Sequence, residues 1–106
     1  MNAEQEMQML RETERGTKAA AVLKNPIYLE AVVKVEQMIT EKWKTAPIRD
    51  VEGQTYLRLM LQALRDVTGH IKSVAETGRL AEQQMAVERG LVERAKAAVR
   101  EFRRVA

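Results

Sequence analysis

The clearest periodic pattern in the chain spans residues 57–74 and reads LRLMLQALRDVTGHIKSV. Apolar side chains recur in it at alternating three- and four-residue intervals: Leu57, Met60, Leu64, Val67, Ile71 and Val74. This is the spacing of the a and d positions of a coiled coil or helical hairpin, because it keeps an apolar seam on one side of a helix. We therefore predict that these residues form the core and self-association seam of a helix over residues 51–77.

A second apolar helix is predicted just before this seam. An Asn-Pro pair at residues 25–26 supplies a capping side chain followed by proline at the first helical position. Apolar residues then recur with helical spacing: Tyr28, Val32, Val35 and Ile39. Pro47 ends this helix, and Asp50 can cap the next one. Helices over 25–44 and 51–77, joined by so short a turn, are expected to fold back as a central antiparallel hairpin.

The segments on either side of this hairpin are also expected to be helical. We predict an N-terminal helix over residues 3–23. Its apolar stripe is weak, and Gly16 interrupts it. Residues 80–105 predict a basic C-terminal helix. Gly78 either ends the third helix or kinks a longer one, because glycine tolerates the left-handed conformation of a helix stop. The expected fold is all-α, with residues 1–106 forming a single helical domain.

The composition favours a small helical protein that self-associates. The chain has 106 residues, of which 45% are hydrophobic and 31% charged, as in folded proteins. Aromatic residues make up 4%, and the apolar set is mostly Ala, Val, Leu and Met, which favours helices over sheets. Apolar residues wrap well over half of the helix between residues 57 and 64, and two helices cannot cover them all. We therefore predict a homo-oligomer. The competing explanation is that the N-terminal and C-terminal helices of the same chain cover these residues.

Other features of the sequence bear on its location. Without cysteine there is no disulfide framework and no thiolate metal site. No apolar run approaches the length of a membrane span, and residues 1–10 do not resemble a signal peptide. A cytoplasmic protein without membrane contact is expected.

The sequence offers no set of residues for catalysis or for a cofactor. His70 is the one histidine and Ser73 the one serine, three residues apart on one predicted helix. Such a pair has neither a strained nucleophile turn nor an oxyanion hole, and a metal site needs several converging ligands. No glycine-rich phosphate loop is present. We expect a non-enzymatic protein without metal, cofactor or small-molecule substrate.

The positive charge of the chain lies near its C-terminal end. Residues 1–78 contain 11 basic and 11 acidic side chains, whereas residues 79–106 contain seven basic and four acidic ones. Five of these basic residues are candidates for binding a partner or a nucleic acid: Arg94, Lys96, Arg100, Arg103 and Arg104. Clustered cations on one helix form an electrostatic footprint for DNA or an acidic protein surface. The alternative is a solvated helix whose arginines pair with neighbouring glutamates.

The run over residues 23–81 resembles small helical proteins of tailed bacteriophages and prophages. Three features carry the resemblance: an Asn-Pro-aromatic opening (Asn25, Pro26, Tyr28), a Trp before a Thr-x-x-x-x-Asp turn (Trp43, Thr45, Asp50) and a closing Thr-Gly-basic-Leu-Ala (Thr77 to Ala81). Helical hairpins resemble one another by composition, so the match is of moderate specificity.

The resemblance implies a viral protein acting in the host cytoplasm or within the virion. The leading expectation is a role in DNA packaging, as a small terminase-like subunit, or in head assembly, with the chain itself, DNA or an acidic phage or host protein as partner. The alternative is a small effector that binds and inhibits a host protein. Against packaging, no separate helix-turn-helix is evident; against head assembly, the chain is short for a scaffold.

Overall fold

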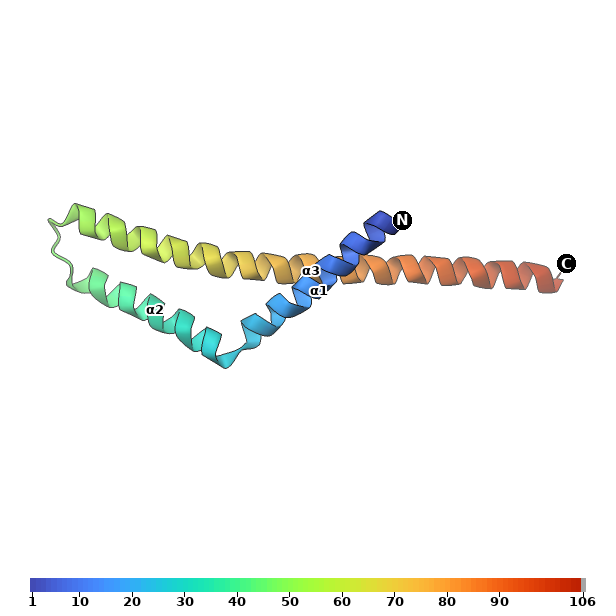
Figure 1. The fold of residues 1–106 in the computed structure, drawn as a ribbon, viewed down its shortest axis with the longest axis horizontal. Helices are drawn as coiled ribbons and strands as arrows, with labels where there is room; N and C mark the ends of the chain where they lie inside the picture. The colour runs from blue at the N-terminus through green and yellow to red at the C-terminus, as the bar shows by residue number, and fades with distance from the viewer. Residues whose placement is uncertain (106) are drawn as a thin grey trace.

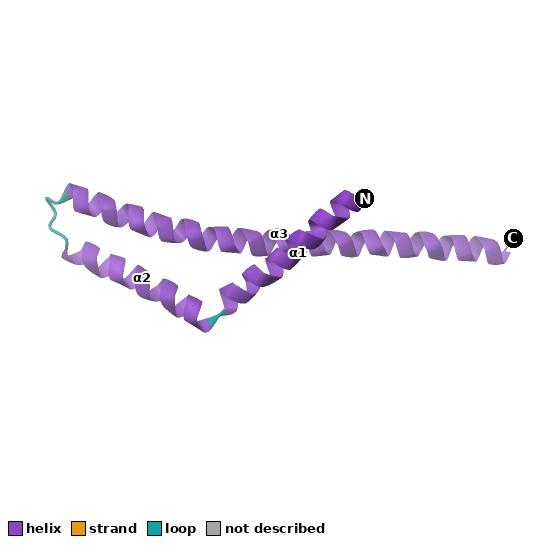
Figure 2. Ribbon diagram, in the orientation of Figure 1, coloured by secondary structure: helices purple, strands orange, loops and turns teal. Residues whose placement is uncertain are grey.

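The computed structural model describes residues 1–105, which form three α-helices joined by short connections. They are α1 (Ala3–Lys24), α2 (Pro26–Thr45) and α3 (Val51–Val105) (Figure 1; Figure 2). The prediction of an all-α protein is confirmed. The molecule is extended rather than compact, measuring 85 × 25 × 19 Å with a radius of gyration of 23.6 Å. A compact domain of this length would have a radius of about 13 Å.

Each helix begins at a side chain that accepts hydrogen bonds from the free N–H groups of the first turn. Asn2 and Gln5 form a reciprocal capping box at the start of α1. Asn25 Oδ1 accepts from the backbone N–H of Ile27 at 2.8 Å, and it also accepts from the next residue. Asp50 Oδ1 accepts from the N–H of Gly53 at 2.9 Å. The helix starts predicted at the Asn-Pro pair and after Asp50 are therefore confirmed.

The main packing in the molecule is between α1 and α3, which cross near their glycines (Figure 1). A Cβ placed on Gly16 would lie 2.6 Å from the Cα of Gly78, and one placed on Gly78 would lie 2.5 Å from the Cα of Gly16. Only hydrogen fits at this point, so the two backbones touch. Gly16 therefore does not interrupt α1, which is continuous; it is where α1 approaches α3 most closely.

The third helix continues without a break for 55 residues. Gly78 lies inside it with an ordinary helical backbone, since no glycine in residues 1–105 has a positive φ. The predicted division into helices over 51–77 and 80–105 is therefore corrected. The sequence signal for the end of a helix at this point is the glycine itself. In the structure, Gly78 instead allows the backbones of α1 and α3 to approach closely.

Helix α2 runs back along the first part of α3 but contacts it far less than α1 does (Figure 1). Of the predicted seam, Leu57 is buried, and three residues are half-buried: Leu64, Ile71 and Val74. Met60 and Val67 remain 37% and 59% exposed. Leu61 and Thr68 are half-buried instead, so the covered face of α3 is rotated away from the centre of the predicted seam. Within one chain, the seam is only partly covered.

The buried interior is very small for a chain of this length. Its apolar members are Ala19, Ile39, Leu57 and Ala81. Large apolar side chains on all three helices are exposed, including Leu10 at 54%, Met38 at 54% and Phe102 at 74%. Monomeric proteins rarely leave so much apolar surface open to water, so this structure indicates oligomerisation or partner binding. No helix within residues 1–105 is long and apolar enough to cross a membrane.

Candidate functional site

The C-terminal part of α3 projects beyond the rest of the molecule as a bare helix (Figure 1). Every residue from 89 to 105 is exposed, whereas Met85 and Glu88 just before them are half-buried beside α1. We call residues 89–105 the arm; at 1.5 Å per residue it is about 25 Å long. The arm faces the start of α1 as far as Lys96, and beyond that residue it presents its whole circumference for binding.

One side of the arm is apolar. Its apolar residues follow the same three-four spacing as the predicted seam and continue it: Val92, Ala95, Val99 and Phe102. Val92 and Val99 are 49% and 50% exposed, and Phe102 is 74% exposed. At equivalent positions two turns and one turn before the arm, Ala81 is buried and Met85 is half-buried. The arm therefore carries a binding stripe of the kind that α1 covers further back on the same helix.

The predicted basic residues lie around this stripe, all exposed and all on the arm. Lys96 Nζ lies 3.8 Å from Glu93 Oε1, and Arg104 Nη2 lies 3.1 Å from Glu101 Oε1. No ion pair within residues 1–105 involves Arg94, Arg100 or Arg103. The alternative of a fully paired, solvated face thus fits two of the five cations, and the other three have no ion pair within residues 1–105.

A groove opens where the start of α1 leaves α3 at the base of the arm. Its volume is about 460 Å³. Its apolar walls are Leu10 of α1 with Met85 and Val92 of α3. Its charged residues are Glu6, Glu88, Arg89, Glu93 and Lys96. The groove therefore combines apolar walls with three carboxylates and two cations, and its net negative charge suits an apolar side chain flanked by cations.

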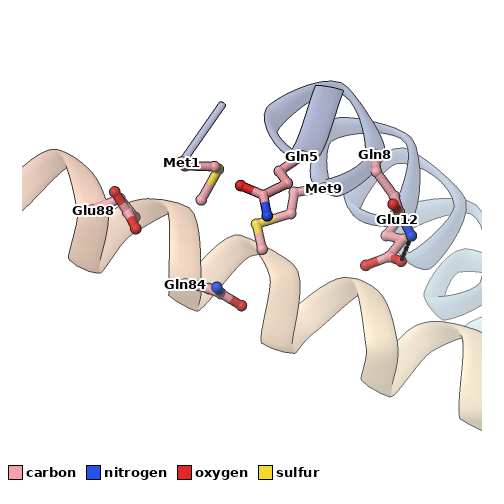
Figure 3. A pocket seen from close by; sticks show the side chains of 7 residues that line it. All are labelled: Met1, Gln5, Gln8, Met9, Glu12, Gln84 and Glu88. Carbon is pink, nitrogen blue, oxygen red and sulfur yellow. Dashed lines mark hydrogen bonds between the residues drawn. The ribbon is translucent and has the colours of Figure 1, made fainter. Parts of the chain in front are cut away.

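A second hollow lies between the same two helices and shares Glu88 with the groove. Figure 3 shows Met1, just before α1, and Met9 of α1 on one side of this hollow, with Gln84 and Glu88 on the α3 side. Gln8 Nε2 donates to Glu12 Oε1 at 3.4 Å at its edge. This hollow is lined mainly by polar side chains, so the groove with Leu10 is the better candidate for an apolar ligand.

The remaining polar groups do not form a site for chemistry. His70 and Ser73 face Glu12 and Arg15 of α1, but no hydrogen bond in the described part of the chain joins them. No group of three or more His, Cys, Asp or Glu side chains within residues 1–105 is placed to hold a metal ion.

One ion pair shifts the pKa values of both of its members. Arg79 Nε donates to Glu76 Oε2 at 3.0 Å, and this hydrogen bond lowers the pKa of Glu76 and raises that of Arg79. Both side chains are more than half exposed. An exposed pair of this kind contributes little to stability, so it does not point to a functional site.

Comparison with known proteins gives no family: no family model, curated protein or solved structure matches the chain. The function has to be argued from the arm and the groove themselves.

The structure brings the basic residues together on the arm, as their spacing predicts, and it adds the groove. The groove could not be found from the sequence, because it exists only where α1 crosses α3. The sequence signal for that crossing is a pair of small residues, Gly78 and Ala81. They stand where the three-four spacing of the large seam residues would continue.

Proposed function

We propose that this chain is a non-enzymatic, oligomeric assembly protein whose C-terminal arm docks on an acidic macromolecular surface. The observation that supports this most strongly is the arm itself. All of its residues are exposed, and it carries an apolar stripe and three cations that form no ion pair within residues 1–105. A bare helix of this kind has no role in holding one chain together. Apolar and basic groups on it are suited to macromolecular binding.

In the setting that the resemblance implies, this role is DNA packaging or head assembly. Packaging requires that the arm contacts duplex DNA, in which case binding depends on the phosphates and is largely independent of sequence. Head assembly requires an acidic protein surface instead. The arm has no aromatic residue placed to stack on bases, apart from Phe102 on its apolar stripe, so contact with single strands is not favoured.

The arm is tested by removing three of its cations. Replacing Arg100, Arg103 and Arg104 with alanine should abolish binding to random-sequence duplex DNA, which is expected to be weak and steeply salt-sensitive in the parent chain. Fluorescence anisotropy of a labelled duplex at several salt concentrations measures both properties. The variant should keep its helix content by circular dichroism, because these side chains are exposed and their one ion pair, between Arg104 and Glu101, is an exposed contact within the helix.

The matched control removes three cations from the same helix outside the arm: Arg58, Arg65 and Lys72, which are also exposed. This control should bind like the parent. If the arm variant binds as tightly as the parent, the arm is a solvated helix and the proposal fails. A parent chain that self-associates but ignores duplex favours head assembly over packaging.

A further inference from the structure

The groove and the tip of the arm have complementary surfaces, although one chain cannot join them. We define the tip as residues 99–105. It carries Val99 and Phe102 on one side with Arg100 and Arg103 beside them. The groove offers apolar walls and carboxylates. We propose that the groove of one copy receives the arm tip of a second copy, which rests on the proposed function and names the first partner of the arm.

The charges on the two surfaces match. Glu6 and Glu88 line the groove, and neither forms an ion pair within residues 1–105. The same holds for Arg100 and Arg103 on the tip. The groove also holds Arg89, which has no ion pair within residues 1–105, and the Glu93–Lys96 pair, so its three carboxylates and two cations leave it net negative. Glu6 and Glu88 are therefore the carboxylates that remain for Arg100 and Arg103 on the tip of a second copy. A partly desolvated pairing of these groups fixes the register and raises the rate of association.

The apolar parts match as well. Phe102 is the one phenylalanine in the chain and is 74% exposed, so it gains much from burial. In the groove, Leu10 is 54% and Val92 is 49% exposed. A large aromatic side chain seated against two aliphatic ones is the usual form of an interface anchor.

The occupant has to come from another chain. Val92 lines the groove and Phe102 lies on the tip of the same continuous helix, ten residues further on. At 1.5 Å per residue they are about 15 Å apart along the helix axis, so the tip points away from its own groove. A second copy supplies the tip without any change in α3. If each copy inserts its tip into the groove of the next copy, the contact is heterologous and builds rings or chains. If two copies insert their tips into each other's grooves, they form a closed dimer.

A mixing experiment tests this contact. Leu10→Asp disables the groove and Phe102→Asp disables the tip, and each should weaken self-association by about tenfold or more, because each buries a charge where the parent buries an apolar group. A mixture of the two variants keeps one intact groove and one intact tip. It should form a two-chain species in native mass spectrometry, whereas the double variant stays a single chain of 12.1 kDa.

A charge exchange guards against a variant that simply misfolds. Glu6→Arg and Arg103→Glu lie at exposed positions and should each weaken self-association, whereas the chain that carries both should regain it. If Leu10→Asp or Glu6→Arg leaves the mass unchanged while Phe102→Asp lowers it, the arms pair with each other and the groove proposal is overturned. Unchanged self-association in all four single variants overturns it as well. Neither result affects duplex binding by the arm, so the proposed function is judged separately.

Discussion

Gly78→Ala is expected to destabilise the protein by about 1–3 kcal/mol, the usual cost of adding a group to a packed contact. The added Cβ would lie 2.5 Å from the Cα of Gly16, and 2.7 Å from the backbone oxygen of Glu12. Both neighbours are backbone atoms, so no side-chain rotation relieves the clash. Helices α1 and α3 have to separate, which uncovers Ala19 and Ala81.

The same substitution at Gly69 gives the control. Gly69 lies on the same helix with nothing within 4 Å of the added Cβ. Alanine there should stabilise the protein by about 1 kcal/mol, because alanine has the higher helix propensity. Urea unfolding followed by circular dichroism measures both changes. Opposite signs at the two glycines are the expected result; a stabilised Gly78→Ala variant would show that α1 does not cross α3 at Gly16.

Ile39→Ala should cost about 2–5 kcal/mol, the range for a buried isoleucine. Ile39 is 2% exposed and is the most deeply buried large side chain on α2. Because the protein has so few buried apolar residues, this cost is a large part of its total stability, which for small proteins is about 5–15 kcal/mol. The variant should unfold at a much lower urea concentration than the parent.

Ile48 provides an isoleucine of the opposite kind. It lies in the turn between α2 and α3 and is 90% exposed. Ile48→Ala should change the free energy of unfolding by no more than about 0.5 kcal/mol. Equal losses in the two variants would mean that α2 does not pack against the rest of the chain as the structure shows.

Local signals in the sequence predicted the helices well. The Asn-Pro pair at residues 25–26 and Asp50 mark helix starts through hydrogen bonds within three residues, which do not depend on the rest of the fold. The composition, rich in Ala, Leu and Met, predicted an all-α protein for the same reason. Clustering of the cations on one helix also followed directly from their spacing.

Tertiary features were less accessible to sequence reasoning. Glycine is unfavourable inside a helix. The sequence alone therefore indicates that Gly16 interrupts the first helix and that Gly78 ends or kinks the third. Their role depends on a contact between residues 62 positions apart in the chain. The buried face of α3 also deviates from the predicted seam, because an α-helix drifts by about 20° per seven residues relative to a strict heptad. The positions of α1 and α2 then decide which face of α3 is covered.

Self-association is tested most directly by the mass of the parent protein in solution as a function of its concentration. Three surfaces are left uncovered in a single chain: the seam residues Met60 and Val67, the groove and the arm. We propose that a second copy of the chain covers them. Light scattering at micromolar concentrations should give a mass above 12.1 kDa that rises with concentration and falls with added salt. A monomer of 12.1 kDa over the whole range, at low and high salt, would contradict the account.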